Sequence, residues 1–119
     1  MYHQTLTDKL LQVDNLVLDL WNCTLNKGET AIHLNPKEAK IMVLLMANVN
    51  QVVNRDQLIK EVWHSNGSGP SRTLDVYIRW LRQKIEDNPN IPEYILTRRA
   101  LGYELRIKDK NGTMKQTDQ

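Results

Sequence analysis

The sequence contains a single cysteine, Cys23, so no disulfide can form within the chain. Because disulfides persist mainly in oxidising compartments, this composition favours a cytoplasmic location. No apolar run reaches the roughly 18 residues that a membrane-spanning helix needs, and no signal peptide follows Met1. We therefore expect a cytoplasmic protein without a membrane partner, in which Cys23 is a small buried residue of a strand.

The residues needed for catalysis or metal binding are also missing. The three histidines are far apart, and none has a cysteine or a second histidine at the spacing of a metal site. His64 has two serines and Asp75 nearby, but no nucleophile elbow surrounds them. The stretch "GSG", residues 67–69, lacks the Lys-Ser/Thr pair of a phosphate-binding loop. We expect no enzyme activity, no catalytic residue, no metal and no cofactor.

What the sequence does contain is a globular composition with unevenly placed charge. Its 119 residues, 40% hydrophobic and 25% charged, suit one soluble domain. The net charge is only +2. From Arg72 to Lys110, however, nine basic residues face six acidic ones, whereas the preceding residues hold six basic and seven acidic ones. This asymmetry favours a polyanionic partner.

Short strands are predicted before Asn35. Leu16 and Leu18 alternate with Val17 and Asp19, and a Gly-containing turn follows at residues 26–29. We expect three or four antiparallel strands in this part of the chain. The larger aromatic residues predicted to lie in the core or at its edge are Trp21, Trp63 and Tyr103.

Two capped helices are predicted next. Asn35 can cap the first helix, with Pro36 at its first position and Glu38 completing a capping box. Residues 51–54 form a short strand pattern, and Asn54, with a glutamine three residues later, repeats the capping logic for a second helix.

A third helix is predicted from Ser71 to Ile85. At about 100° per residue, one side is apolar throughout and is predicted to be buried. This side carries Leu74, Ile78, Leu81 and Ile85. The opposite side carries Arg72, Asp75, Val76, Arg79, Arg82, Gln83 and Glu86, with Tyr77 and Trp80 on the flank. Burial does not explain Val76, and Asp75 can pair with Arg79 one turn later.

The order of elements points to a function for the basic side. Two helices that support a third follow helix-turn-helix logic, and an α-helix fits the major groove of B-DNA. Residues 94–107 then predict a hairpin whose tip lies near Ala100 to Gly102, with Arg98 and Arg99 beside it. Arginine is attracted to a narrow minor groove. The alternative is a charged helix face that only meets solvent.

Several separated motifs resemble one family. "SRTLDVYIRWLRQKIEDNP" and "ILTRRALGYEL" resemble the winged-helix DNA-binding domain of OmpR/PhoB-type response regulators, and "LNPKEAKIMVLLMANVNQVVNRDQLIKEVW" resembles its first two helices. The resemblance covers residues 10–107, which leaves residues 1–9 as an N-terminal linker or tail and 108–119 as a flexible tail. It implies an α+β winged helix-turn-helix with a four-stranded N-terminal antiparallel sheet, three helices and a C-terminal hairpin wing.

The resemblance also implies a site and partners. The implied function is sequence-specific binding of double-stranded DNA for transcription regulation, with the third helix in the major groove and the wing in the minor groove. The implied DNA-binding residues are Arg72, Thr73, Val76, Tyr77, Arg79, Trp80, Arg82, Gln83, Arg98 and Arg99. An RNA polymerase contact is implied for the loop residues His64, Ser65, Asn66, Gly67, Ser68 and Gly69.

The implied assembly is a monomer in isolation that dimerises on a direct-repeat operator, with a receiver domain if the chain is part of a longer protein. Three residues depart from the family pattern. Trp80 stands where many members carry a second consecutive Arg, Ala100 replaces a wing Gly, and Arg98 replaces an apolar residue. The alternative function is a winged-helix protein-interaction module that does not bind DNA.

Overall fold

The computed structural model describes residues 5–7, 10–64 and 71–107. The chain begins with an antiparallel sheet in which each strand pairs with the next one in sequence. Its strands are β1 (Thr5–Thr7), β2 (Leu10–Val13), β3 (Leu16–Asp19), β4 (Thr24–Lys27) and β5 (Thr30–His33). We predicted three or four strands, and β1 adds the fifth. This strand lies ahead of the domain boundary predicted at residue 10.

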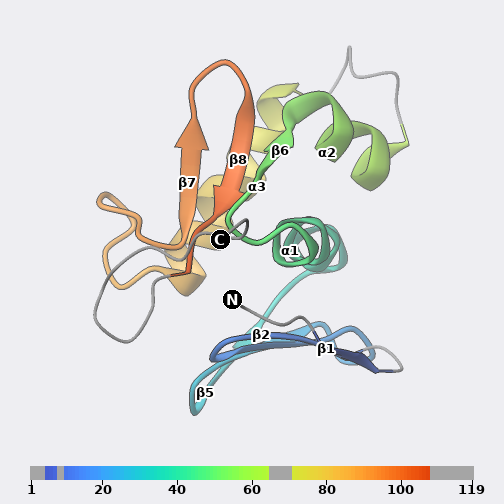
Figure 1. The fold of residues 1–119 in the computed structure, drawn as a ribbon, viewed down its shortest axis with the longest axis vertical. Coiled ribbons are helices and arrows are strands. Elements are labelled where there is room, and N and C mark those ends of the chain that lie inside the picture. The colour runs from blue at the N-terminus through green and yellow to red at the C-terminus, as the bar shows by residue number, and fades with distance from the viewer. Residues whose placement is uncertain (1–4, 8–9, 65–70, 108–119) are drawn as a thin grey trace, which may run out of the picture.

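Alternation along the strands gives the sheet one apolar face. Leu11 pairs with Leu18 across β2 and β3, and Leu18 pairs in turn with Leu25 on β4. All three side chains are buried. In Figure 1 this sheet forms a layer beneath α1 (Pro36–Ala47), which lies between it and the remaining elements. The alternation of inward and outward side chains along these strands therefore forms the part of the core that lies between the sheet and α1.

Two predictions for the β3–β4 connection are wrong. Trp21, expected at the core, is 70% exposed, and Cys23 is half-buried in a turn rather than in a strand. The Asp19 carboxylate accepts hydrogen bonds from the backbone N–H groups of Trp21 and Asn22, at 2.9 and 3.3 Å. This local turn ends the alternation before Trp21 and points its ring outward.

The first two helices begin where predicted. Asn35 caps α1 by accepting from the backbone N–H of Glu38 at 2.8 Å. The Glu38 carboxylate in turn accepts from the backbone N–H of Asn35 at 2.9 Å. Asn54 ends the short strand β6 (Val52–Asn54) and caps α2 (Arg55–Trp63) by accepting from the backbone N–H of Asp56. Glu38 is fully buried, and its charge is balanced by Lys84 at 2.6 Å.

The third helix, α3 (Ser71–Ile85), buries the apolar stripe predicted for it. A second sheet, in the order β6-β8-β7, contains the C-terminal hairpin of β7 (Ile95–Arg98) and β8 (Gly102–Leu105). One continuous core joins both sheets and the three helices. No helix among the residues described by the structure is long and apolar enough to cross a membrane.

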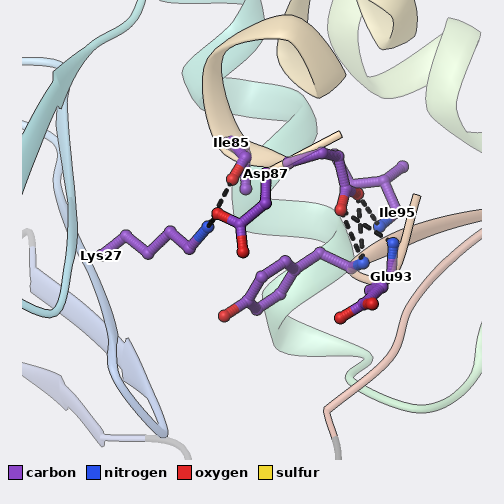
Figure 2. Close-up of polar contacts among 7 residues, drawn as sticks. Lys27, Ile85, Asp87, Glu93 and Ile95 are labelled. Carbon is purple, nitrogen blue, oxygen red and sulfur yellow. Dashed lines mark hydrogen bonds and ion pairs between the residues drawn. The ribbon is translucent and has the colours of Figure 1, made fainter. Parts of the chain in front are cut away.

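The end of α3 departs from the expected pattern. Glu86, predicted on the outer side, is only 7% exposed. Its carboxylate accepts hydrogen bonds from the backbone N–H groups of Glu93, Tyr94 and Ile95, at 2.8 to 3.1 Å (Figure 2). These charge-assisted bonds offset the cost of burying a carboxylate. They also fix the hairpin relative to the end of α3.

A lysine joins the N-terminal sheet to the same place. Lys27 extends from β4, and its ammonium donates to the backbone carbonyl of Ile85 at 2.7 Å and to Asp87 at 3.1 Å (Figure 2). The carbonyl is one of those that a helix end leaves without an internal partner, and a cation there is favourable. The sheet, α3 and the hairpin therefore meet at one junction.

Candidate nucleic-acid interface

The outer side of α3 carries exposed basic and polar side chains. Arg72, Thr73, Arg79 and Gln83 are exposed, and Val76 is half-buried among them. No described carboxylate forms an ion pair with Arg72 or Arg79. This side therefore combines uncompensated positive charge with a small apolar surface and an amide, the groups that contact phosphates and base edges.

Arg82, predicted on the same side of α3, lies at the edge of that side and is bonded to the hairpin. Its Nε donates to the carbonyl of Ile95 at 3.0 Å, and its Nη2 donates to the hydroxyl of Thr97 at 2.8 Å. The guanidinium also lies 5.8 Å from the ring centroid of Tyr103. Arg82 thus joins α3 to the hairpin while adding its charge to the surface between them.

Asp75 connects α3 to two other elements rather than to Arg79. Its Oδ1 accepts from Arg55 Nη1 of α2 at 2.8 Å and from the Tyr103 hydroxyl of β8 at 2.5 Å. Burial alone would raise the pKa of Asp75, but the bonds from Arg55 and Tyr103 together lower it below its usual range. Burial and the same carboxylate raise the pKa of Tyr103. The negative charge of Asp75 is therefore compensated within the fold.

Of the two arginines near the hairpin tip, one is exposed and the other is bonded within the fold. Nε of Arg98 donates to Oε1 of Glu104 at 2.6 Å, and Glu104 is only 3% exposed. Nε of Arg106 lies 2.9 Å from the other Glu104 oxygen, within ion-pair range but without the alignment of a hydrogen bond. Arg99 is exposed at the turn. The acidic residue Glu104 can be read from the sequence of the second hairpin strand. Only the register between the two strands of the hairpin shows that it lies beside Arg98.

Two residues give the tip its shape. Ala100 has φ of +64°, the left-handed conformation for which glycine is better suited. The N–H of Leu101 donates to the carbonyl of Arg98 at 2.9 Å and closes the turn. Gly102 is so close to β6 that an added Cβ would lie 1.9 Å from the carbonyl oxygen of Val53. The hairpin can therefore pack against β6 only with glycine there.

A groove of about 470 Å³ lies between α3 and the segment that leads into the hairpin. Arg79, Arg82 and Gln83 line its helical side, and Pro89 and Pro92 line the opposite side. Of the ten predicted DNA-binding residues, three therefore line this groove between α3 and the segment that leads into the hairpin. Tyr77 is half-buried and Trp80 exposed at the opposite edge of α3.

The predicted polymerase-contact loop is mostly outside the described residues, which omit 65–70. Of this set the structure describes only His64. It is exposed and ends α2 in a left-handed conformation, with φ of +57°. No group of three or more His, Cys, Asp or Glu side chains suited to a metal ion occurs within the described ranges.

Comparison with known proteins gives a consistent result. Residues 28–105 match the family described as "Transcriptional regulatory protein, C terminal". The chain is 40% identical over 99 residues to the alkaline phosphatase synthesis transcriptional regulatory protein SphR of Synechococcus elongatus, covering 83% of this chain and 38% of SphR. The chain thus spans well under half the length of this relative.

Two solved structures resemble the fold closely. The response regulator DrrB, a Thermotoga maritima OmpR/PhoB homologue, superposes with a TM-score of 0.70 at 33% identity, over 83% of this chain and 45% of DrrB. The DNA-binding domain of RstA from Klebsiella pneumoniae, solved in complex with the RstA box, gives a TM-score of 0.72 at 28% identity, over 82% of this chain and 97% of that one. The architecture is the winged helix-turn-helix of these domains.

Proposed function

The chain belongs to the family of C-terminal domains of transcriptional regulatory proteins, of the OmpR/PhoB type, and from this we propose that it binds double-stranded DNA in a sequence-specific manner to regulate transcription. The outer side of α3 enters the major groove, and the hairpin wing reaches the adjacent minor groove. The observation that carries this proposal is the exposed pair Arg72 and Arg79, which no described carboxylate neutralises.

The contacts divide into two kinds by their chemistry. Arg82 lines the groove beside α3 and Arg72 is exposed on the same helix, positions that suit phosphate contacts. Arg99, exposed at the hairpin turn, suits the minor groove instead. Val76 and Gln83 are on the outer side of the helix, where a methyl group or an amide can meet base edges. Phosphate contacts set orientation and affinity, and the base contacts set the sequence that is preferred.

Salt dependence tests the proposal. Fluorescently labelled genomic fragments are titrated with the protein at about 50 and 200 mM salt, and the slope of log affinity against log salt is measured. Because each neutralised phosphate releases counterions, we expect affinity to fall by orders of magnitude over this range. Absence of binding to any fragment would favour the alternative, a winged-helix module that binds only protein.

We also propose an assembly on the operator. The domain is a monomer alone and dimerises head to tail on a direct repeat. It acts in the cytoplasm. A receiver domain precedes it in a longer protein. The partial coverage of SphR and DrrB supports this last point. Sedimentation of the domain with and without a duplex carrying two half-sites tests the assembly. Protection of an inverted repeat would contradict it.

The loop that follows His64 is proposed to contact RNA polymerase. The exposed position of His64, where α2 ends, supports this. Substitutions at Asn66 or Ser68 are expected to reduce activated transcription in a reconstituted system while DNA affinity stays the same. Equal activation by the substituted and unsubstituted proteins would leave the loop as a simple connector.

A further inference from the structure

Trp80 is an exposed aromatic residue on the proposed DNA-binding helix. Its side chain is 40% exposed at one edge of the outer side of α3. Val76 is four residues earlier, so the two side chains are neighbours on the helix surface. Together they form an apolar patch next to the exposed guanidinium of Arg79. Core packing does not account for the exposed part of this indole.

A row of aromatic contacts holds this indole. The ring of Tyr77 lies 5.0 Å from that of Trp80, tilted by 52°. Tyr77 in turn makes an edge-on contact with Trp63 of α2, at 5.3 Å and 82°. Lys37 of α1 lies 5.8 Å from the Trp63 ring centroid and closes the far end of the row. Three helices therefore support a side chain whose outer part stays exposed.

This support has a consequence for binding. A long side chain that is already held in place loses little freedom when it meets a partner. Trp80 carries no charge, and among the described residues its ring contacts lie on the side of Tyr77 rather than of Arg79. An apolar surface in the major groove can meet one apolar feature of the bases, the 5-methyl group of thymine. The neighbouring guanidinium of Arg79 favours DNA over an uncharged protein surface as the occupant.

We propose that Trp80, with Val76, forms a preorganised apolar patch on α3 that reads thymine methyl groups in the half-site. The proposal rests on the proposed DNA-binding function and specifies the bases that one edge of the helix selects. Tyr77 acts as a positioning residue, because it holds the indole without belonging to the outer side of the helix.

Replacement of thymine by uracil tests this directly, because it removes only the methyl group. A duplex is first selected by the protein from a random double-stranded library, and each thymine of that duplex is then replaced singly by deoxyuridine. We expect one or two replacements to weaken the unsubstituted protein about fourfold, the effect of losing one buried methyl-sized group. Trp80→Ala should bind more weakly and lose the response to at least one of these replacements, while Val76 can still respond to another.

Two further variants separate the possible explanations. Trp21→Ala removes another exposed indole, in the turn between β3 and β4, and should keep the uracil response. Trp80→Arg should lose the same uracil response as Trp80→Ala, while its salt slope becomes steeper by about one phosphate contact. Thermal unfolding followed by circular dichroism shows whether each variant is folded, and the Arg variant serves if the Ala variant is not.

Each outcome has a distinct meaning. An equal uracil response in the unsubstituted protein and in both Trp80 variants would overturn the proposal. So would a Trp80→Ala protein that binds the duplex normally yet no longer activates transcription, since the indole would then contact a protein. If the unsubstituted protein selects no duplex, the DNA-binding function itself fails.

Discussion

The hydroxyl of Tyr103 donates to Oδ1 of Asp75 at 2.5 Å, although one residue is on β8 and the other on α3. Arg55 of α2 donates to the same oxygen at 2.8 Å. One carboxylate therefore joins the helix that is proposed to enter the major groove to the wing and to the supporting helix. The relative orientation of these elements depends on its ionised form.

The first prediction concerns acid stability. Because the pKa of Asp75 is lowered in the folded protein, its contribution is complete above the ordinary value of about 4 and is lost as pH falls through the lowered value. Half of its side chain is exposed, so screening limits this contribution to about 1 kcal/mol. Asp75→Asn should unfold more easily at neutral pH and lose part of the decline in stability between about pH 4 and 2.

Urea unfolding at a series of pH values measures this effect. Asp87→Asn is the matched control, because the Asp87 side chain is 98% exposed and pairs only with Lys27 among the described residues. At alkaline pH the relevant group is Tyr103, whose pKa is raised in the folded protein. Its protonated hydroxyl contributes stability that is complete below about pH 10 and is lost as pH rises through the raised pKa. Tyr103→Phe should remove that alkaline decline. Identical pH profiles for all three variants would contradict this account.

The second prediction concerns Arg79. Arg79→Ala should weaken binding to the selected duplex by about 1–3 kcal/mol if the guanidinium reads a base, or weaken all duplexes equally if it contacts phosphate. Lys40→Ala removes an exposed positive charge from α1 and should have a small effect. Fluorescence anisotropy on specific and scrambled duplexes distinguishes the two cases. Unchanged affinity of a folded Arg79→Ala protein would remove this residue from the interface.

The third prediction separates the two wing arginines. Arg99 is exposed at the tip, so Arg99→Ala should abolish a preference for A·T-rich flanks, whose narrow minor groove attracts arginine. Arg98→Ala should instead reduce stability by about 1–3 kcal/mol, because it removes one partner of the buried Glu104 carboxylate. Binding to duplexes with A·T-rich and G·C-rich flanks, together with thermal unfolding, measures both effects. Equal small losses on both duplexes would show that the wing adds only general charge.

The fourth prediction concerns Gly102. Its added Cβ would overlap the Val53 carbonyl, so Gly102→Ala should separate β6 from β8 and cost about 3 kcal/mol or more in stability. Gly28→Ala is the matched control, since φ is +60° there but no atom lies within 4 Å of the added Cβ. It should cost about 1 kcal/mol of backbone strain. Similar losses for the two variants would show that the close approach to β6 is easily relieved.

Local patterns in the sequence determined the elements and their inward faces. The capping box at Asn35 and Glu38 depends on residues three apart, and it formed as predicted. The stripe that includes Leu74 and Ile78 follows helical periodicity, which is fixed before any tertiary contact exists. The family motifs added the architecture, because several of them occur together in one order.

Only the tertiary structure decided which charged side chains remain available to a partner. Glu86, Asp75 and Arg98 were all expected on outer surfaces, but each is bonded to a group from another element or across the hairpin. Periodicity gives the direction of a side chain from its own helix or strand and says nothing about what packs beside it. For Trp80, helical periodicity predicted the position on the flank of the helix. The ring contacts with Tyr77 and, through it, Trp63 could not be predicted from the sequence. Contacts between distant segments depend on how the elements pack, and that packing is a property of the whole chain rather than of any one stretch.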